Sequence, residues 1–107
     1  MAAAKLVVLY PRPTDVAAFE ETYLGEHVPL AAEKIAGHTG FGFARVVDAA
    51  GGEPPYHRVT EIHFPTMEAL RRSLADPGTQ EAAAHAVSVS TGGPPIFLIC
   101  EQGDADG

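Results

Sequence analysis

The chain contains one cysteine, no tryptophan and no apolar run long enough to cross a membrane. A single cysteine excludes an intramolecular disulfide, so the hydrophobic core alone must hold the fold, and a reducing cytoplasm suits such a chain. The apolar run near the start covers residues 6–10, far short of the roughly 20 residues that span a bilayer. We therefore expect a cytoplasmic protein that has no membrane partner.

Basic residues are also scarce, with seven Lys and Arg against fourteen Asp and Glu and a formal charge of −7. Nucleic acids are bound by clustered positive charge, and only Arg71 and Arg72 are adjacent, so we expect no nucleic-acid partner. A chain of 107 residues predicts one domain, 1–107, with an ordered part at about 5–101 and a frayed acidic tail at 102–107.

Apolar periodicity and turn residues predict the strands and helices. The strands are short β-branched and aliphatic runs between proline and glycine turns, and we expect them at residues 5–10, 41–47, 57–64 and 96–101. Apolar residues recur at i, i+3 and i+7 in two helices, at about residues 16–24 and 67–74. A capping residue precedes each helix, Thr14 or Asp15 in the first and Thr66 in the second, and proline-initiated helices follow at residues 29–34 and 78–87.

This order of elements predicts an α+β, ferredoxin-like βαββαβ fold. Two split βαβ units form a four-stranded antiparallel sheet, with the first and third strands central and the helices on one face. Both faces of the first strand are apolar, since Leu6 and Val8 point one way and Val7 and Leu9 the other. The face without helices therefore needs a cover. We expect a second copy of the sheet to supply it, which makes the chain a homodimer, a dimeric α+β barrel.

The most informative segment covers residues 23–30, Tyr-Leu-Gly-Glu-His-Val-Pro-Leu. Gly25 disfavours a helix and Pro29 fits the first position of a new one, which places His27 in a gap between two helices. An imidazole there titrates near neutral pH. Two interpretations stay open: His27 hydrogen-bonds a carbonyl and orders the junction, or it acts as general acid or base at the mouth of a cleft.

Several elements in order resemble the EthD family, named for ethyl tert-butyl ether degradation, of the dimeric α+β barrel superfamily. They are Leu9-Tyr10-Pro11 with Asp15 and Phe19, Tyr23 with His27-x-Pro29-Leu30, Lys34-Ile35-x-Gly37, and residues 64–74 leading to Gly92-Gly93. The chain departs from the family where Ala36 replaces a proline and where residues 86–91 lack the expected acidic and aromatic side chains. The resemblance spans residues 6–101 and implies a role in catabolic or biosynthetic pathways.

We take His27 as the candidate catalytic residue and expect a largely apolar pocket beside it, between the first helices and the sheet. Two tyrosines would orient a substrate there, while two phenylalanines form either core or an apolar wall with a charge at its rim. Proton transfer also needs a second polar group to fix the substrate. The candidates for substrate binding are Tyr10, Tyr23, Phe41, Phe43, Arg45, Glu61 and His63.

The sequence predicts no metal and no cofactor. His57, Glu61 and His63 share a strand face, but a metal would need a fourth ligand, and no His-x-His or helical pair supports one. The glycines of residues 37–42 precede a strand and do not open a helix, which argues against a nucleotide, and His27 alone does not indicate haem. We expect His38 and His85 at the surface.

The leading hypothesis is a protein that acts on a small hydrophobic molecule in a degradative or secondary-metabolic pathway. It would do so by cofactor-independent proton transfer or oxygenation at His27, as an isomerase, cyclase or monooxygenase-like enzyme. The alternatives are a non-catalytic carrier or accessory protein for a partner enzyme, and a structural barrel without a ligand. The enzyme needs a polar group opposite His27, whereas the carrier needs only an apolar cavity.

Overall fold

The computed structural model describes residues 3–103. Residues 104–107 of the predicted tail lie outside the described residues. The elements in chain order are β1 (Ala4–Pro11), α1 (Val16–Thr22), the π-helix η1 (Tyr23–His27), α2 (Val28–Lys34), β2 (Gly40–Arg45), β3 (Tyr56–Phe64), α3 (Met67–Leu74), α4 (Pro77–Val89) and β4 (Ile96–Glu101). Within residues 3–103, no helix has the length and apolarity to cross a membrane.

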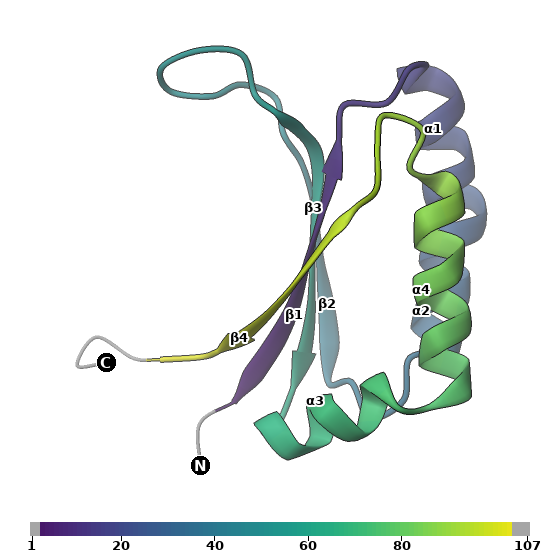
Figure 1. Cartoon of the computed structure of the whole chain (residues 1–107), viewed down its shortest axis with the longest axis vertical. Coiled ribbons are helices and arrows are strands. Elements are labelled where there is room, and N and C mark those ends of the chain that lie inside the picture. The colour runs from purple at the N-terminus through teal and green to yellow at the C-terminus, as the bar shows by residue number, and fades with distance from the viewer. Residues whose placement is uncertain (1–2, 104–107) are drawn as a thin grey trace.

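The four strands form one antiparallel sheet in the order β2-β3-β1-β4. All helices lie on one side of this sheet, and the opposite side is bare (Figure 1). The predicted ferredoxin-like α+β fold is therefore confirmed, and β1 and β3 are central because each split βαβ unit inserts one strand between the two that it connects.

Side chains cap the N-termini of α1, α3 and α4, and the caps of α1 and α3 are residues that the sequence predicts. Asp15 accepts a hydrogen bond from the backbone N–H of Ala18 at 3.1 Å, and Thr66 accepts one from Ala69 at 3.1 Å. The carboxylate of Asp76 accepts one from Gly78 at 2.8 Å at the start of α4. These bonds satisfy donors that the first helical turn leaves free, so the chain enters each helix at a fixed residue.

The predicted gap around His27 is wrong, because α1, η1 and α2 follow one another without interruption. The backbone N–H of Val28 donates to the carbonyl of Tyr23, five residues earlier, and Gly25 keeps a negative φ. Pro29 lacks an N–H, and its ring would crowd the carbonyl four residues back in a regular helix. The wider π turn accommodates the proline without a break. His27 consequently lies inside a continuous helical segment, 7% exposed and directed at the core.

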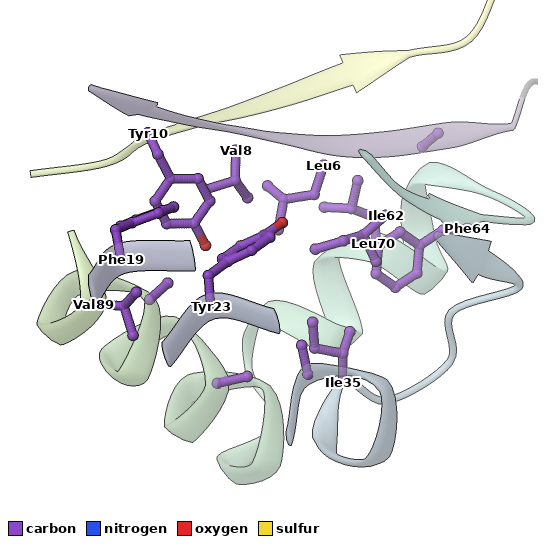
Figure 2. Packing of buried hydrophobic residues seen from close by; sticks show 14 residues of the cluster. Leu6, Val8, Tyr10, Phe19, Tyr23, Ile35, Ile62, Phe64, Leu70 and Val89 are labelled. Atoms are coloured by element: carbon purple, nitrogen blue, oxygen red, sulfur yellow. The ribbon is translucent and has the colours of Figure 1, made fainter. Parts of the chain in front are cut away.

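The core lies between the helices and one face of the sheet. Leu6, Val8 and Tyr10 of β1 point toward the helices, where Phe19 and Tyr23 pack beneath them (Figure 2). The rings of Tyr10 and Tyr23 meet edge to face, with their centroids 5.3 Å apart. This packing fixes the direction of both tyrosine hydroxyls and so sets up one end of the site.

The alternate residues of each strand point to the side without helices, which we call the open face. Its strand register brings together side chains that are mostly apolar: Lys5, Val7, Leu9, Val59, Glu61, His63, Ile96, Leu98 and Cys100. Leu98 and Ile96 are 43% and 39% exposed in the single chain. The two-sided apolar pattern of the first and last strands thus corresponds to one covered and one bare face.

Candidate functional site

A cavity of about 260 Å³ lies between the sheet and the helices. Its wall is apolar except for His27, Thr60 and Thr79, and the remaining wall residues are Leu6, Val8, Ala31, Ile35, Phe41, Phe43, Ile62, Leu74, Ala82, Ala83, Ala86, Phe97 and Ile99. An apolar cavity of about 150 Å³ is enough to hold benzene. This cavity can therefore accept a molecule of about two fused rings.

Alanines on α4 create this space. Ala82, Ala83 and Ala86 face the cavity, where larger side chains would fill the gap between α4 and the sheet. Solvent reaches the wall at the edge strands, since Phe43 on β2 is 39% exposed and Phe97 on β4 is also 39% exposed. A ligand can enter at a sheet edge without unfolding a helix.

The wall carries no charged side chain among the residues that the structure describes. Its hydroxyl groups already have partners, because Thr60 bonds the hydroxyl of Tyr23, and Thr79 bonds Ser73 at 2.9 Å and accepts from the N–H of Ala36 at 3.0 Å. A charged ligand would lose its hydration here without a counter-charge. The cavity is therefore suited to a neutral molecule.

His27 is held by partners at both ring nitrogens. Its Nε2 lies 3.2 Å from the hydroxyl of Tyr10, and its Nδ1 lies 2.9 Å from Nδ1 of His85 on α4. The planes of the two rings are inclined by 10° and their centroids lie 5.1 Å apart, so the two Nδ1 atoms meet edge to edge. The imidazole in the cavity wall is therefore the middle member of a hydrogen-bonded series, Tyr10–His27–His85.

His85 is the site residue that the sequence did not reveal: we expected a surface group, and it is half-buried in contact with His27. A signal for it exists in the helix periodicity. Ala82, Ala86 and Val89 form the buried stripe of α4, and His85 lies directly beside that stripe. A histidine next to the buried face of an alanine-rich helix is therefore a candidate for an internal contact.

Burial first, and the neighbouring His85 second, lower the pKa of His27 to about 4. Burial raises the pKa of Tyr10 well above its usual value. At neutral pH His27 is thus a neutral imidazole, and Tyr10 keeps its proton. The site holds a base without a buried charge.

The structure brings part of the predicted site together. Phe41 and Phe43 line the cavity, Tyr10 reaches it through His27, and Tyr23 reaches it through Thr60. Arg45 does not line the cavity and borders a separate shallow depression with Arg12 and His57.

Glu61 and His63 also lie outside the cavity, on the open face. Side chains alternate along β3, and Thr60 and Ile62 face the helices, so Glu61 and His63 must face the other way. Glu61 pairs there with Lys5 at 2.7 Å. We expected at least one of the five polar candidates beside His27. Tyr10 is in contact with it, whereas Arg45, Glu61 and His63 lie away from the cavity.

The three residues weighed as metal ligands are also separated. A register shift near the end of β1 turns His57 toward α1, where its Nε2 lies 3.2 Å from Glu20. Glu20 is shared with Arg58, whose Nε donates to it at 3.0 Å. Residues 3–103 contain no group of three or more His, Cys, Asp or Glu placed to hold a metal ion.

Comparison with known proteins identifies related sequences and structures. The sequence model of the EthD domain matches residues 11–88. A relative from Rhodococcus erythropolis, described as an uncharacterized 11.0 kDa protein in the thcB-thcC intergenic region, is 26% identical over 98 residues, or 92% of this chain and 94% of the relative. The structure of an EthD family protein from Bacillus halodurans is 27% identical with a TM-score of 0.84, and the match covers 94% of this chain and 99% of that one.

More distant structures share the fold alone. SnoaB from Streptomyces nogalater, described as a cofactor-independent oxygenase, has a TM-score of 0.66 at 17% identity, with 98% of this chain and 97% of that one covered. A protein from Thermobifida fusca, described as a dimeric ferredoxin-like protein of unknown function, has a TM-score of 0.68 at 14% identity, with 94% and 92% covered.

Proposed function

The chain belongs to the EthD family, and from this premise we propose that it binds a small, neutral, apolar organic molecule in the cavity and exchanges a proton with it at His27. One observation carries the proposal: a neutral imidazole stands in the wall of an otherwise apolar cavity. A base in such a place can remove a proton from a bound weak acid without a competing charge nearby. The reaction belongs to a degradative or secondary-metabolic pathway.

The composition of the wall limits the substrate. No lysine or arginine is among the described wall residues, so the conjugate base has no permanently charged cation beside it. Its negative charge must then be spread within the molecule itself, as in the enolate of a ketone conjugated with an aromatic ring. SnoaB supports the view that this fold can act without a cofactor.

The test uses 2-tetralone, a neutral two-ring ketone whose C1–H is flanked by a carbonyl and an aromatic ring. In the proposed step the hydroxyl of Tyr10 releases Nε2 of His27, Nε2 accepts the C1 proton of the ketone in the cavity, and the bonding pair becomes part of the enolate. In D₂O the enolate then gains deuterium at C1. We expect the protein to accelerate this exchange by about 100-fold or more over buffer.

The His27→Gln variant is the control for that measurement. Glutamine retains a polar side chain in the wall but is not a base of useful strength, so the acceleration should vanish while 2-tetralone still binds. Exchange that is equally fast in the variant would contradict a role for His27 as the base. Failure of 2-tetralone to bind the wild type would contradict the ligand class.

A specific observation favours one second candidate, a non-catalytic carrier. Both ring nitrogens of His27 already have protein partners. In a carrier the imidazole would have a structural role alone, as part of the cavity wall. The carrier hypothesis predicts that 2-tetralone binds equally to the wild type and His27→Gln and that neither accelerates exchange. The two functions are thus separated by one pair of measurements.

The open face supports assembly as a homodimer. Ile96 and Leu98 expose about two fifths of their surface there, beside half-buried Val7 and Leu9, and an isologous contact between two such sheets would cover all four. The dimeric Thermobifida fusca protein of the same fold supports this arrangement. The single cysteine supports a cytoplasmic location.

A further inference from the structure

We propose that His85 is a positioning residue that fixes the tautomer of His27 and passes a proton between His27 and solvent. This inference rests on the proposed function, because a proton needs a path only if the cavity exchanges one. His85 lies on α4, outside the cavity wall. It contacts the wall residue His27, with the two Nδ1 atoms 2.9 Å apart.

The hydroxyl of Tyr10 determines which nitrogen of His27 carries hydrogen. Tyr10 is 1% exposed, and among the described residues its hydroxyl has one hydrogen-bond partner, Nε2 of His27. A buried O–H needs an acceptor, so Tyr10 donates and Nε2 presents its lone pair. A neutral imidazole has one N–H, which must then be on Nδ1 of His27 and point at His85.

His85 has to accept that hydrogen bond with its own Nδ1, which leaves its hydrogen on Nε2. Without His85, the buried Nδ1–H of His27 would lose its acceptor, and the ring could instead carry its hydrogen on Nε2 and donate to Tyr10. The tautomer with its lone pair at Nε2 is the one that can accept a proton from a ligand there once Tyr10 releases Nε2. His85 therefore keeps His27 in the basic tautomer.

The position of His85 also provides a way out for the proton. His27 is 7% exposed, whereas His85 is only half-buried at the surface of α4. Tyr10 and Tyr23 are the other titratable groups that contact His27, and both are buried. The carboxylates in the neighbouring sequence, Glu26 on η1 and Glu81 on α4, are exposed. On the side of His27 that faces α4, His85 therefore offers a route from His27 to water.

The proton transfer is balanced without a buried imidazolium. A proton from the ligand arrives at Nε2 of His27, the Nδ1 proton of His27 moves to Nδ1 of His85, and the Nε2 proton of His85 leaves to water. One proton enters and one leaves, and both rings end neutral with their hydrogens exchanged. The reverse sequence delivers a solvent proton, or deuteron, to the ligand anion.

The test combines ¹⁵N NMR of the histidine rings in the ligand-free protein with the 2-tetralone exchange assay. The wild type should show His27 protonated at Nδ1 and bare at Nε2. His85→Ala should shift His27 toward the Nε2-protonated tautomer. In His85→Asn, the amide oxygen can take the place of Nδ1 as acceptor, so the Nδ1-protonated tautomer should return.

The exchange assay then separates positioning from relay. Asparagine can accept the hydrogen bond but cannot hand on a proton, so both variants should exchange deuterium at least about tenfold more slowly than the wild type while binding 2-tetralone equally. An unchanged His27 tautomer in His85→Ala would overturn the positioning role. Wild-type exchange rates in His85→Asn would overturn the relay. Because the tautomer is read without ligand, failure of 2-tetralone to bind would contradict the proposed function and leave the positioning result intact.

Discussion

The Nδ1 atoms of His27 and His85 lie 2.9 Å apart although 58 positions separate the two residues in the chain. The contact joins the π-helix η1 to α4. Pro29 fits the π turn that carries His27, and the alanines of α4 let the second histidine approach. The site therefore depends on two local features of the sequence that meet only in the folded chain.

The buried state of His27 predicts a pH dependence of stability. Its pKa is lowered to about 4 in the folded chain, whereas a histidine of the unfolded chain titrates near about 6.5. Between these values the unfolded state binds more protons, so the free energy of unfolding should fall as the pH decreases from about 6.5 to about 4. Urea unfolding at several pH values should show a smaller fall in His27→Gln. An equal fall in both proteins would contradict a buried neutral His27.

The ion pair between α1 and β3 should be a major local source of stability. Arg58 is bidentate on Glu20 and also lies over the ring of Tyr23, with its guanidinium carbon 5.1 Å from the ring centroid. Glu20→Gln should lower the free energy of unfolding by about 1–3 kcal/mol at neutral pH. Glu21→Gln, on the exposed side of the same helix, should change it by less than about 0.5 kcal/mol.

Acid should remove that difference. The Arg58 hydrogen bond holds the pKa of Glu20 below its usual range, so the stabilisation is present above the usual carboxyl pKa and is lost as the pH falls through the lowered one. The Glu20→Gln variant and the wild type should therefore approach each other in stability below about pH 4. A gap that persists in acid would show that the variant acts through packing and not through the charge.

Gly25 gives a test of the continuous helical segment. Its φ is negative and a Cβ there would meet no atom within 4 Å, so Gly25→Ala introduces no strain. Alanine should raise the free energy of unfolding by about 0.5–1 kcal/mol, because glycine loses more backbone entropy in a helix. Thermal unfolding measures the change. A loss of stability would indicate that the chain does break at Gly25.

Much of the fold could be predicted from the sequence, because its signals are local. Asp15, Thr66 and Asp76 mark helix starts by their own side chains, and alternation in β1 shows two apolar faces. The prediction of a gap at His27 was wrong. Helix propensity scores glycine and proline each as helix-breaking, whereas the π turn accommodates both within one helical segment.

The site was less predictable because it depends on packing between distant segments. His27 was identified from its own surroundings, but its contact with His85 exists only after α4 docks on η1. Glu61 and His63 were expected beside His27 but lie on the open face of the sheet. A strand with two apolar faces does not reveal which face the helices cover. The cavity itself follows from the small size of Ala82, Ala83 and Ala86 relative to the space they face.

The homodimer is tested by a charge on the open face. Leu98→Glu would bury an unpaired carboxylate between two sheets, which costs several kcal/mol and should abolish the dimer and lower the melting temperature. Val87 on α4 is 51% exposed, so Val87→Glu is the control and should leave the molecular mass of the dimer in solution unchanged. A wild-type protein that is monomeric by light scattering at micromolar concentration would contradict the dimer.

The central claim is that the cavity beside His27 holds a small apolar molecule, and calorimetric titration with 2-tetralone tests it most directly. Ala83 lines the cavity and Ala84 is exposed on the same helix, so leucine at each position gives a matched pair. Ala83→Leu should fill the space and weaken binding by about tenfold or more, equivalent to about 1.4 kcal/mol, while Ala84→Leu should bind like the wild type. Equal binding by the wild type and both variants would place the ligand elsewhere and contradict the account.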